Sequence, residues 1–295
     1  MSRIEEITIR AVDGLNLSCL YSEALNPIAL VQIIHGMSEY KQRYVNLINF
    51  LTNKGYSVII CDNRGHGKSV NQEYPLGHIG NIDLMVSDQY EVSKYIKERN
   101  KTKKLYIFAH SMGSLIARHY LYKYDTMIEK LILCGTVNYT PLSKIGIVLS
   151  KIIIRIKGKY HYSPLLFALS NDFSFKDDLS WLSYNEENIE NYKKDPLCGF
   201  KFDSYSNLVL FSLVYKLKTK FKASNTELNI LSLSGCDDRT TAHTEGILRS
   251  LNILKGYGYK KLDFIEFKDM KHEILNEKNN ELVYKKIEEF FVGER

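Results

Sequence analysis

The sequence has few of the features that mark disordered or membrane-spanning chains. Only 5 of its 295 residues are proline, which argues against disorder. No stretch reaches the roughly 18 uninterrupted apolar residues of a membrane span, and the first ten residues, MSRIEEITIR, lack an apolar signal core. We therefore expect a globular, cytoplasmic protein.

Cysteines are too few and too irregularly placed to predict a disulfide framework or a metal site. Five are present, an odd number with no paired spacing: Cys19, Cys61, Cys134, Cys198 and Cys236. Cys61 and Cys134 lie in apolar runs, where a reduced cysteine behaves as a small buried hydrophobic residue. A chain this long rarely depends on disulfides. The sequence therefore predicts reduced thiols, no metal and no cofactor.

Charge of one sign is not concentrated anywhere. The net charge of +6 arises from 40 basic and 34 acidic side chains that are scattered along the chain. With no basic block and no nucleic-acid-binding module, we expect no nucleic-acid partner. The 44% hydrophobic and 25% charged content is typical of a globular protein with a sizeable core.

Six short apolar runs alternate with segments of helical spacing. The runs cover residues 28–35, 56–62, 104–110, 129–135, 228–235 and 261–267. Their hydrophobicity is continuous rather than alternating, which is typical of parallel strands buried on both faces. Residues 5–10 and 15–22, joined through AVDG, predict an antiparallel hairpin at the sheet edge. The pattern indicates an α/β fold with a mainly parallel sheet flanked by helices.

The alternation stops between residues 139 and 220. About eighty residues are too many for a structureless loop, so we expect an inserted helical cap, with the core formed by residues 1–138 and 221–295. Apolar residues recur at helical spacing from Leu142 to Ile156, and three cations lie toward the other face: Lys144, Lys151 and Arg155. We favour an apolar face that packs over a pocket, and contact with an anionic lipid surface is the alternative.

Every chemically suggestive cluster follows the end of a predicted strand. In chain order the clusters are HGMSEY (35–40), DNRGHGKS (62–69), HSMGS (110–114), CDDRT (236–240) and KDMKHEILNE (268–277). Ligands of open parallel sheets bind beyond the carboxyl ends of the strands. The clusters therefore predict one shared site.

Ser111 is the predicted nucleophile of that site. It leaves an apolar strand and is followed at once by an amphipathic helix, a turn that projects the central side chain outward. Such a turn needs small neighbours two residues away on each side, and Ala109 and Gly113 are small. A helix N-cap serine without catalytic function is the alternative.

A serine nucleophile needs a base and an orienting acid. His272 follows the last predicted strand and is the expected base, although a lone surface histidine is a common alternative. Asp237 and Asp238 both follow the preceding strand, and both are also compatible with simple turn formation. The backbone N–H groups of Met37 and Met112 are the expected oxyanion donors, since each lies just after a strand end.

Taken together, these motifs resemble the monoacylglycerol lipase/lysophospholipase (serine aminopeptidase S33-like) family of the α/β-hydrolase fold. The family carries HGxxEH, DxRGHGxS, GHSMGG, GxxD and HExxNE in this order. The resemblance implies an eight-stranded sheet with an inserted cap. It also implies Ser111 as nucleophile, His272 as base and Asp238, three residues after Gly235, as acid, with Met37 and Met112 at the oxyanion. Tyr40, Ala109 and Ser114 depart from the family pattern without removing a reacting group.

The resemblance implies hydrolysis of a small-molecule or lipid ester, such as a monoacylglycerol or lysophospholipid, through an acyl-enzyme, with peripheral membrane contact through the cap. An aminopeptidase of this fold is an alternative that would need acidic cap residues, for which the candidates are Asp172, Asp177, Asp178, Glu186 and Glu187. A catalytically silent ligand-binding protein is another.

Several further residues have weaker interpretations. Phe173, Trp181 and Tyr184 are candidates for an acyl pocket, although aromatic residues at such spacing more often belong to a core. We interpret His35, Arg64 and His66 as residues that hold loops, and His66 as a base is a minor alternative.

Overall fold

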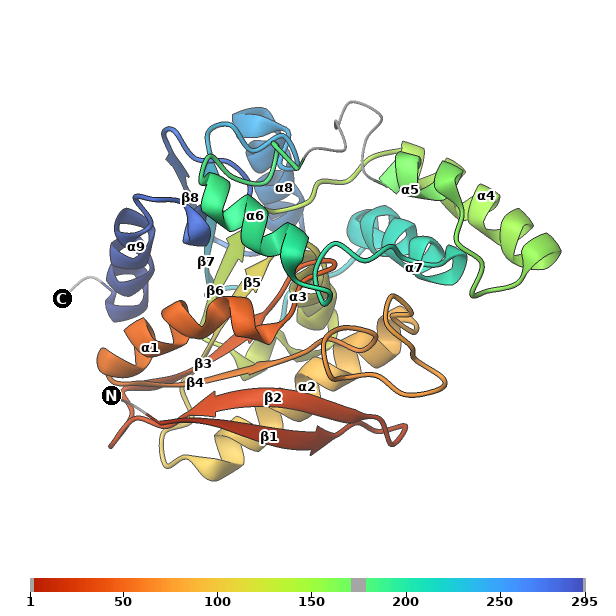
Figure 1. Ribbon diagram of the computed structural model, residues 1–295. Coiled ribbons are helices and arrows are strands. Elements are labelled where there is room, and N and C mark those ends of the chain that lie inside the picture. Colours follow the sequence, from red (N-terminus) through yellow and green to blue (C-terminus); the bar gives the residue numbers. More distant parts are fainter. Residues whose placement is uncertain (1–2, 171–178, 294–295) are drawn as a thin grey trace.

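Helices cover both faces of a central sheet in the computed structural model, which describes residues 3–170 and 179–293 (Figure 1). The strands are β1 (Ile4–Arg10), β2 (Asn16–Ser22), β3 (Ala29–Ile34), β4 (Tyr56–Cys61), β5 (Leu105–His110), β6 (Lys130–Cys134), β7 (Asn229–Gly235) and β8 (Lys261–Phe267). Within the described residues they form one eight-stranded sheet in the order β1-β2-β4-β3-β5-β6-β7-β8.

The sheet is parallel from β4 to β8, whereas β1 and β2 form an antiparallel hairpin at one edge, and β2 pairs antiparallel with β4. Every residue of β3, β4 and β5 is buried, as continuous apolar runs predict for strands covered on both faces. The predicted fold class is confirmed. The carboxyl ends of β3, β5, β6, β7 and β8 meet at one edge of the sheet, where the site forms.

Each face of the sheet has its own set of helices. Leu47 of α1 (Val45–Asn53) and Ile287 of α9 (Glu281–Val292) belong to the core cluster on one face. The cluster on the other face contains residues of α2 (Ile82–Arg99), α3 (Met112–Tyr124) and α8 (His243–Tyr257). Short 3-10 turns are η1 (Lys41–Tyr44), η2 (Asp125–Met127), η3 (Lys216–Lys218) and η4 (Ile274–Asn276).

The segment between β6 and β7 is helical. It contains α4 (Leu142–Lys157), α5 (Pro164–Ser170), α6 (Glu186–Lys194) and α7 (Ser204–Tyr215), of which α4, α5 and α7 gather on one side of the molecule (Figure 1). Val209 and Leu213 of α7 belong to the same core cluster as α2 and α3. Phe173 and the three aspartates of 171–178 lie outside the described residues.

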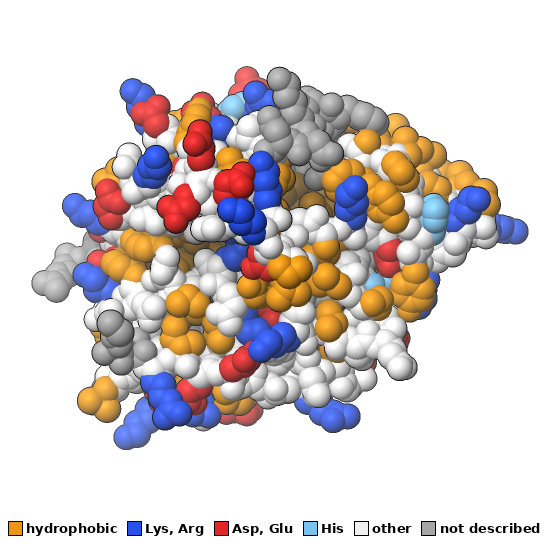
Figure 2. All heavy atoms as spheres, in the orientation of Figure 1, with side chains coloured by type: hydrophobic (Ala, Val, Ile, Leu, Met, Phe, Trp, Pro, Cys, Tyr) orange, Lys and Arg blue, Asp and Glu red, His pale blue; other side chains and the backbone are white. Residues whose placement is uncertain are grey.

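The prediction that α4 packs its apolar face over a pocket is wrong. Its buried residues are the small ones, Ser143, Gly146 and Ser150, and a Cβ on Gly146 would lie 2.6 Å from the Phe211 ring of α7. The small face lets α4 approach α7 closely. Five apolar side chains of the opposite face are exposed instead: Leu142, Ile145, Val148, Ile152 and Ile156. Figure 2 shows hydrophobic side chains gathered over the α4–α5 side of the surface.

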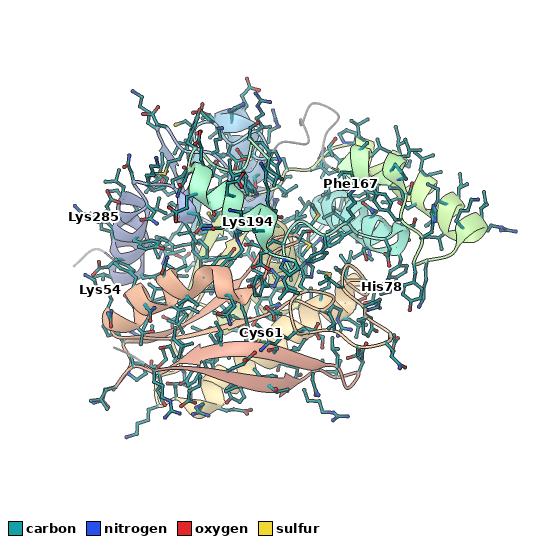
Figure 3. All side chains as sticks on the ribbon, viewed as in Figure 1. Lys54, Cys61, His78, Phe167, Lys194 and Lys285 are labelled. Atoms are coloured by element: carbon teal, nitrogen blue, oxygen red, sulfur yellow. A yellow bond between two sulfur atoms is a disulfide. The ribbon has the colours of Figure 1, made fainter. Side chains whose placement is uncertain are left out.

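The expectation of reduced thiols is also wrong for one pair. Cys19 of β2 and Cys61 of β4 form a disulfide (Figure 3). They lie opposite each other in the β2–β4 register, a proximity that a separation of 42 residues in sequence does not reveal. The described helices include none with the length and apolar character needed to cross a membrane.

Candidate active site

Ser111 occupies a strained turn between β5 and α3. Its backbone has φ 52° and ψ −119°, a conformation that costs a non-glycine residue on the order of 1–3 kcal/mol. The Ser111 N–H donates to the Cys134 carbonyl at 2.9 Å, and the Ser111 carbonyl accepts from the Ser114 N–H at 2.8 Å. These bonds hold the turn from both sides.

The turn requires close packing, which explains its small residues. A Cβ on Gly113 would lie 2.2 Å from the Ile34 carbonyl oxygen, so α3 starts against the end of β3 with no room for a side chain. Ala109 is fully buried within β5. The structure therefore accommodates the Ala109 methyl group at the position where the family has glycine.

The N-cap alternative for Ser111 is not what the structure shows, because its side chain makes no capping bond to α3. The Ser111 hydroxyl lies 2.9 Å from His272 Nε2. On the other side of the ring, His272 Nδ1 lies 3.0 Å from Asp238 Oδ2. Ser111, His272 and Asp238 thus form a continuous line of hydrogen bonds between the ends of β5, β8 and β7.

Of the two adjacent aspartates, Asp238 is the one that contacts His272. It is fully buried, and its other oxygen accepts from the Thr240 N–H at 2.8 Å. Burial raises the pKa of the Asp238 carboxyl, but the charge and hydrogen bond of His272, with the Thr240 amide, hold it below its usual value. The Asp237 carboxylate accepts from the Tyr184 hydroxyl instead.

The loop that carries Met37, the predicted oxyanion donor, lies against Ser111. A Cβ on Gly36 would lie 3.0 Å from the Ser111 Cβ, so the loop after β3 passes directly beside the turn. Met37 lines the cavity next to Ser111, and Met112 is the first residue of α3. An N–H at a helix N-terminus is a favourable donor to developing negative charge.

A buried polar cluster beneath Ser111 has no role in the sequence-based hypotheses. Glu39 Oε1 accepts from the Gly36 N–H at 2.6 Å and from the Tyr44 hydroxyl at 2.8 Å, and it lies 3.1 Å from His110 Nδ1. His110 Nε2 lies 3.3 Å from the His272 carbonyl oxygen. Glu39 and His110 belong to the motifs HGMSEY and HSMGS, but nothing in either motif shows that the two side chains meet.

The charges of this cluster are balanced. Arg43 forms ion pairs with both Glu39 and Glu273. Burial raises the pKa of Glu39, but His110 and Arg43 outweigh it and lower that pKa. Burial lowers the pKa of His110, yet the Glu39 hydrogen bond and charge leave it above its usual value. These shifts favour a Glu39 carboxylate paired with a His110 imidazolium.

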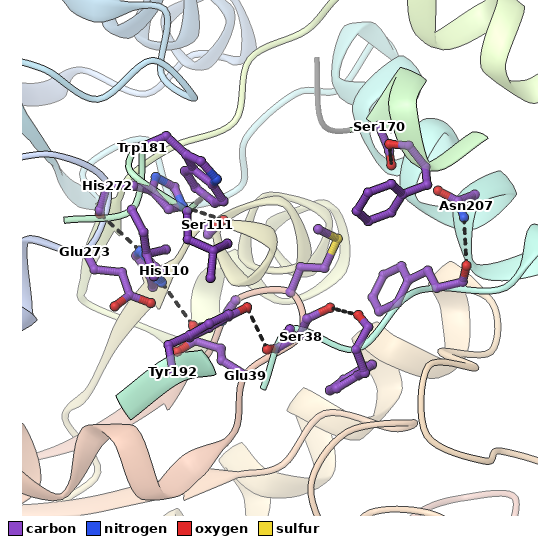
Figure 4. Close-up of a pocket in the computed structure, with 18 residues that line it drawn as sticks. Ser38, Glu39, His110, Ser111, Ser170, Trp181, Tyr192, Asn207, His272 and Glu273 are labelled. Carbon is purple, nitrogen blue, oxygen red and sulfur yellow. Dashed lines mark hydrogen bonds and ion pairs between the residues drawn. The ribbon is translucent and has the colours of Figure 1, made fainter. Parts of the chain in front are cut away.

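Ser111 opens into a cavity of about 130 Å³, large enough for several water molecules or the reacting part of a small ester. Seven apolar side chains line it: Met37, Phe167, Leu179, Trp181, Leu182, Phe200 and Phe202. In Figure 4, Ser111, His272 and Trp181 lie at one end of the cavity, and Ser170 and Asn207 lie at the other. Tyr184, the other described aromatic candidate, is half exposed and does not line the cavity.

The remaining motif histidines and Arg64 contact loops rather than Ser111. His35 Nε2 accepts from the Asn63 N–H at 2.8 Å, and His66 Nε2 accepts from the Ser38 N–H at 3.2 Å. Burial lowers the pKa of His66 to about 3, so this ring is a poor base. Arg64 pairs with Asp13 and Asp88.

The other two departures from the family pattern also form local contacts. The Tyr40 hydroxyl donates to Asp195 at 2.8 Å, and the Ser114 hydroxyl donates to the Ser111 carbonyl at 2.6 Å. Neither side chain blocks Ser111 from His272.

Comparison with known proteins finds relatives over most of the chain. Residues 26–279 match the family described as serine aminopeptidase, S33. Phospholipase YtpA of Bacillus subtilis is 26% identical over 265 residues, which cover 89% of this chain and 95% of that protein. The probable lysophospholipase L2 of Haemophilus influenzae is 28% identical over 122 residues, which cover 40% of this chain and only 39% of that relative.

Solved structures agree on the fold. A thermostable carboxyl esterase from Bacillus coagulans has a TM-score of 0.83 over 99% of both chains at 22% identity. The monoacylglycerol lipase of Paleococcus ferrophilus has a TM-score of 0.72 over 92% of this chain and 96% of that one, at 23% identity. At identities of 22% and 23%, these similarities show the fold of the chain.

Proposed function

Because this chain belongs to the serine aminopeptidase S33 family, in the α/β-hydrolase fold, we propose that it is a serine hydrolase that cleaves carboxylic esters. The observation that carries the proposal is the line of hydrogen bonds from Ser111 through His272 to the buried Asp238, open to a cavity at the Ser111 end. Hydrogen-bond distances of 2.9 and 3.0 Å suit proton transfer and ring orientation.

The reaction proceeds through an acyl-enzyme. His272 takes the Ser111 hydroxyl proton as Ser111 Oγ attacks the ester carbonyl, and Asp238 stabilises the imidazolium that forms. The Met37 and Met112 N–H groups donate to the oxyanion. His272 then protonates the departing alcohol. In the second half, His272 deprotonates a water molecule as its oxygen attacks the acyl carbon. The bond from that carbon to Ser111 Oγ then breaks, His272 returns the proton to Oγ, and the acid is released.

The proposed substrates are esters with one acyl chain, such as monoacylglycerols or lysophospholipids. Apolar and aromatic side chains form most of the cavity wall beside Ser111, which favours an acyl group over a polar one. Two of the relatives are named as a phospholipase and a probable lysophospholipase. Residues 139–220 would act as the cap over this cavity.

The aminopeptidase alternative has less support. Of its candidate acidic residues, Glu186 and Glu187 do not line the cavity, and the aspartates lie outside the described residues. Glu39 and Glu273 do line it, but both are already paired with Arg43. A substrate ammonium would have to compete with that guanidinium.

We also propose that α4 contacts an anionic lipid surface. Its exposed apolar side chains form a stripe along one face of the helix, and Lys144, Lys151 and Arg155 border that stripe. The helix contains no acidic residue. An exposed apolar stripe beside cations suits the boundary between lipid headgroups and acyl chains.

A fluorophosphonate probe tests the nucleophile. We expect wild-type protein to be labelled and to hydrolyse p-nitrophenyl esters, and Ser111→Ala to lose labelling and about 10⁴-fold in kcat/KM. Ser250→Ala is the matched control, because its buried hydroxyl has no hydrogen-bond partner in the described residues. An unlabelled wild type, or labelling of Ser111→Ala equal to wild type, would contradict the proposal. Aminoacyl p-nitroanilides cleaved faster than esters would favour the aminopeptidase.

A further inference from the structure

A short segment of the insertion crosses both loops that carry the partners of Ser111. We name residues 181–185 the strap. The Leu182 carbonyl of the strap accepts from the Glu273 N–H at 2.9 Å, and the Tyr184 hydroxyl donates to Asp237 at 2.9 Å. The strap therefore contacts the residue after His272 and the residue before Asp238.

Glu277 joins the strap to the loop of His272. Glu277 is buried, with 4% of the residue exposed. From the strap it accepts bonds from the Ser183 hydroxyl at 2.9 Å, the Tyr184 N–H at 3.0 Å and the Asn185 N–H at 3.2 Å. From the His272 loop it accepts the Lys271 N–H at 3.0 Å.

Within the described residues, each hydrogen bond to the two oxygens of Glu277 comes from an N–H or O–H donor. Oε1 accepts from Tyr184 and Lys271, and Oε2 accepts from Ser183 and Asn185. No Lys, Arg or His ion pair with Glu277 occurs in the part of the chain that the structure describes. A buried carboxylate without a cation depends on such donors.

These bonds fix the backbone on both sides of His272. Glu277 holds the Lys271 N–H, and the Leu182 carbonyl holds the Glu273 N–H. The Trp181 ring also lies against the His272 ring, with 5.3 Å between centroids and 47° between planes. The strap thus contacts both the backbone next to His272 and the His272 ring.

We propose that Glu277 is a positioning residue that ties the strap to the His272 loop and so keeps the imidazole in line between Ser111 and Asp238. The expected effect of Glu277 on turnover rests on the proposed hydrolase function. The expected effect on the position of the His272 ring does not rest on that function, so the two effects give independent readouts.

Glu277→Gln tests the proposal with little change in volume. The substitution replaces one carboxylate oxygen with an NH₂ group, which is a hydrogen-bond donor. In either orientation of the amide, this NH₂ group faces N–H or O–H donors and cannot accept their hydrogen bonds. We expect kcat to fall about tenfold with KM nearly unchanged, because a small displacement of a catalytic group slows the chemical step. Most apolar residues of the cavity wall, among them Phe167, Phe200 and Phe202, lie outside the strap, so we expect KM to change less than kcat.

Asp125→Asn is the matched control. Asp125 is also a buried carboxylate that accepts backbone N–H groups, from Ser224 at 2.7 Å and Asn225 at 2.9 Å, and it follows α3 at the opposite end of the strands. The melting temperatures of the two variants should fall by similar amounts, but Asp125→Asn should keep the wild-type kcat. A purely structural role for Glu277 would make the two variants alike in kcat as well.

Trp181 supplies the second readout, because it is the single tryptophan of the chain. An imidazole in contact with an indole quenches its emission, and the His272 ring lies 5.3 Å from the Trp181 ring, so replacing His272 by Gln should raise the Trp181 emission by a measurable step. In the Glu277→Gln background the step should shrink to less than half, whereas the Asp125→Asn background should keep it.

The outcomes separate the two proposals. A wild type without esterase activity contradicts the proposed function, and the fluorescence step alone then decides the role of Glu277. Wild-type kcat or a wild-type fluorescence step in folded Glu277→Gln overturns the inference. If that variant does not fold, Ser183→Ala replaces it. It removes one strap donor, with an expected loss in kcat of about twofold to threefold, and wild-type values in either readout overturn the inference equally.

Discussion

Glu39 and its partner His110 connect three parts of the site. The Glu39 carboxylate accepts the N–H of Gly36, in the loop after β3, and pairs with His110, which precedes Ser111. Through His110 Nε2 the connection continues to the His272 carbonyl. The imidazolium form of His110 can donate from both nitrogens, so it satisfies both acceptors at once.

The Glu39–His110 pair predicts a pH-dependent contribution to stability. The lowered pKa of Glu39 contributes stability at every pH above 4.5, the ordinary pKa of the group. This stability is lost as the pH falls toward the folded-state pKa. The raised pKa of His110 gives stability that is complete below its ordinary value of 6.5 and is lost as the pH rises through the folded-state pKa. Both contributions are therefore complete only between these two values.

We expect Glu39→Gln to lower the free energy of unfolding most between about pH 4.5 and 6.5, and progressively less at higher pH. Urea denaturation of both proteins across a pH series measures the difference. Ser250→Ala serves as the control, because no titratable group bonds to its hydroxyl in the described residues. A difference that is constant from pH 4.5 to 9 would contradict the ion pair.

At the scale of elements, α4 shows why a periodic pattern predicts a helix but not its orientation. Apolar residues from Leu142 to Ile156 follow helical spacing, and the helix forms over Leu142–Lys157. The face that packs is the one with Ser143, Gly146 and Ser150, because small residues let two helices approach closely. Hydrophobicity alone favours the opposite face, since it does not include the shape of the partner helix.

The exposed stripe of α4 predicts binding to anionic vesicles. Ile145→Glu should lower the affinity for phosphatidylglycerol vesicles about tenfold, since burying one large apolar side chain contributes about 1.5–3 kcal/mol. Co-sedimentation with the vesicles measures this affinity. Activity on a soluble ester should not change, because no α4 residue lines the cavity.

Leu25→Glu is the matched control for that experiment, because Leu25 is 94% exposed and lies outside α4. It should bind vesicles as the wild type does. Equal binding of Ile145→Glu and wild type, or equal binding to phosphatidylcholine and phosphatidylglycerol, would contradict an anionic lipid contact through this helix.

At the scale of the whole molecule, the insertion is not isolated from the hydrolase core. Leu213 of α7 is fully buried in the cluster that contains α2 and α3, and His119 Nε2 of α3 lies 2.9 Å from the Leu213 carbonyl oxygen. The strap adds contacts to the loops after β7 and β8. Shared burial of this kind favours one cooperative unfolding transition.

We therefore expect the urea unfolding curves from Trp181 fluorescence and from far-UV circular dichroism to coincide. Trp181 reports on the insertion, whereas circular dichroism reports on all helices and strands. Leu213→Ala should shift both curves together and cost about 2–5 kcal/mol. A fluorescence transition at a lower urea concentration than the circular dichroism transition would show that the insertion unfolds separately.

Sequence patterns predicted the strands closely. The run at 261–267 coincides with β8, and the run at 104–110 exceeds β5 by one residue. Local rules suffice for such segments, because continuous hydrophobicity and flanking turn residues act over a few positions. For the same reason, the motif clusters at the strand ends predicted a common site before any contact was known.

Those local rules could not predict contacts between residues that lie far apart in the sequence. The choice between Asp237 and Asp238 depends on which carboxylate faces a ring 34 residues away, and only the resemblance to a family favoured Asp238. The pairing of Cys19 with Cys61 depends on the β2–β4 register. The Glu39 and Glu277 bonds depend on loops that meet only after the sheet has formed.

The sequence by itself determined the α/β architecture, the order of its strands and helices and the chemical groups available at the strand ends, because these follow from local periodicity and turn chemistry. Only the tertiary structure decided which groups meet, which face of α4 is exposed and how the strap holds His272. Those features depend on the packing of segments far apart in the chain, where shape and buried hydrogen bonds outweigh local preference.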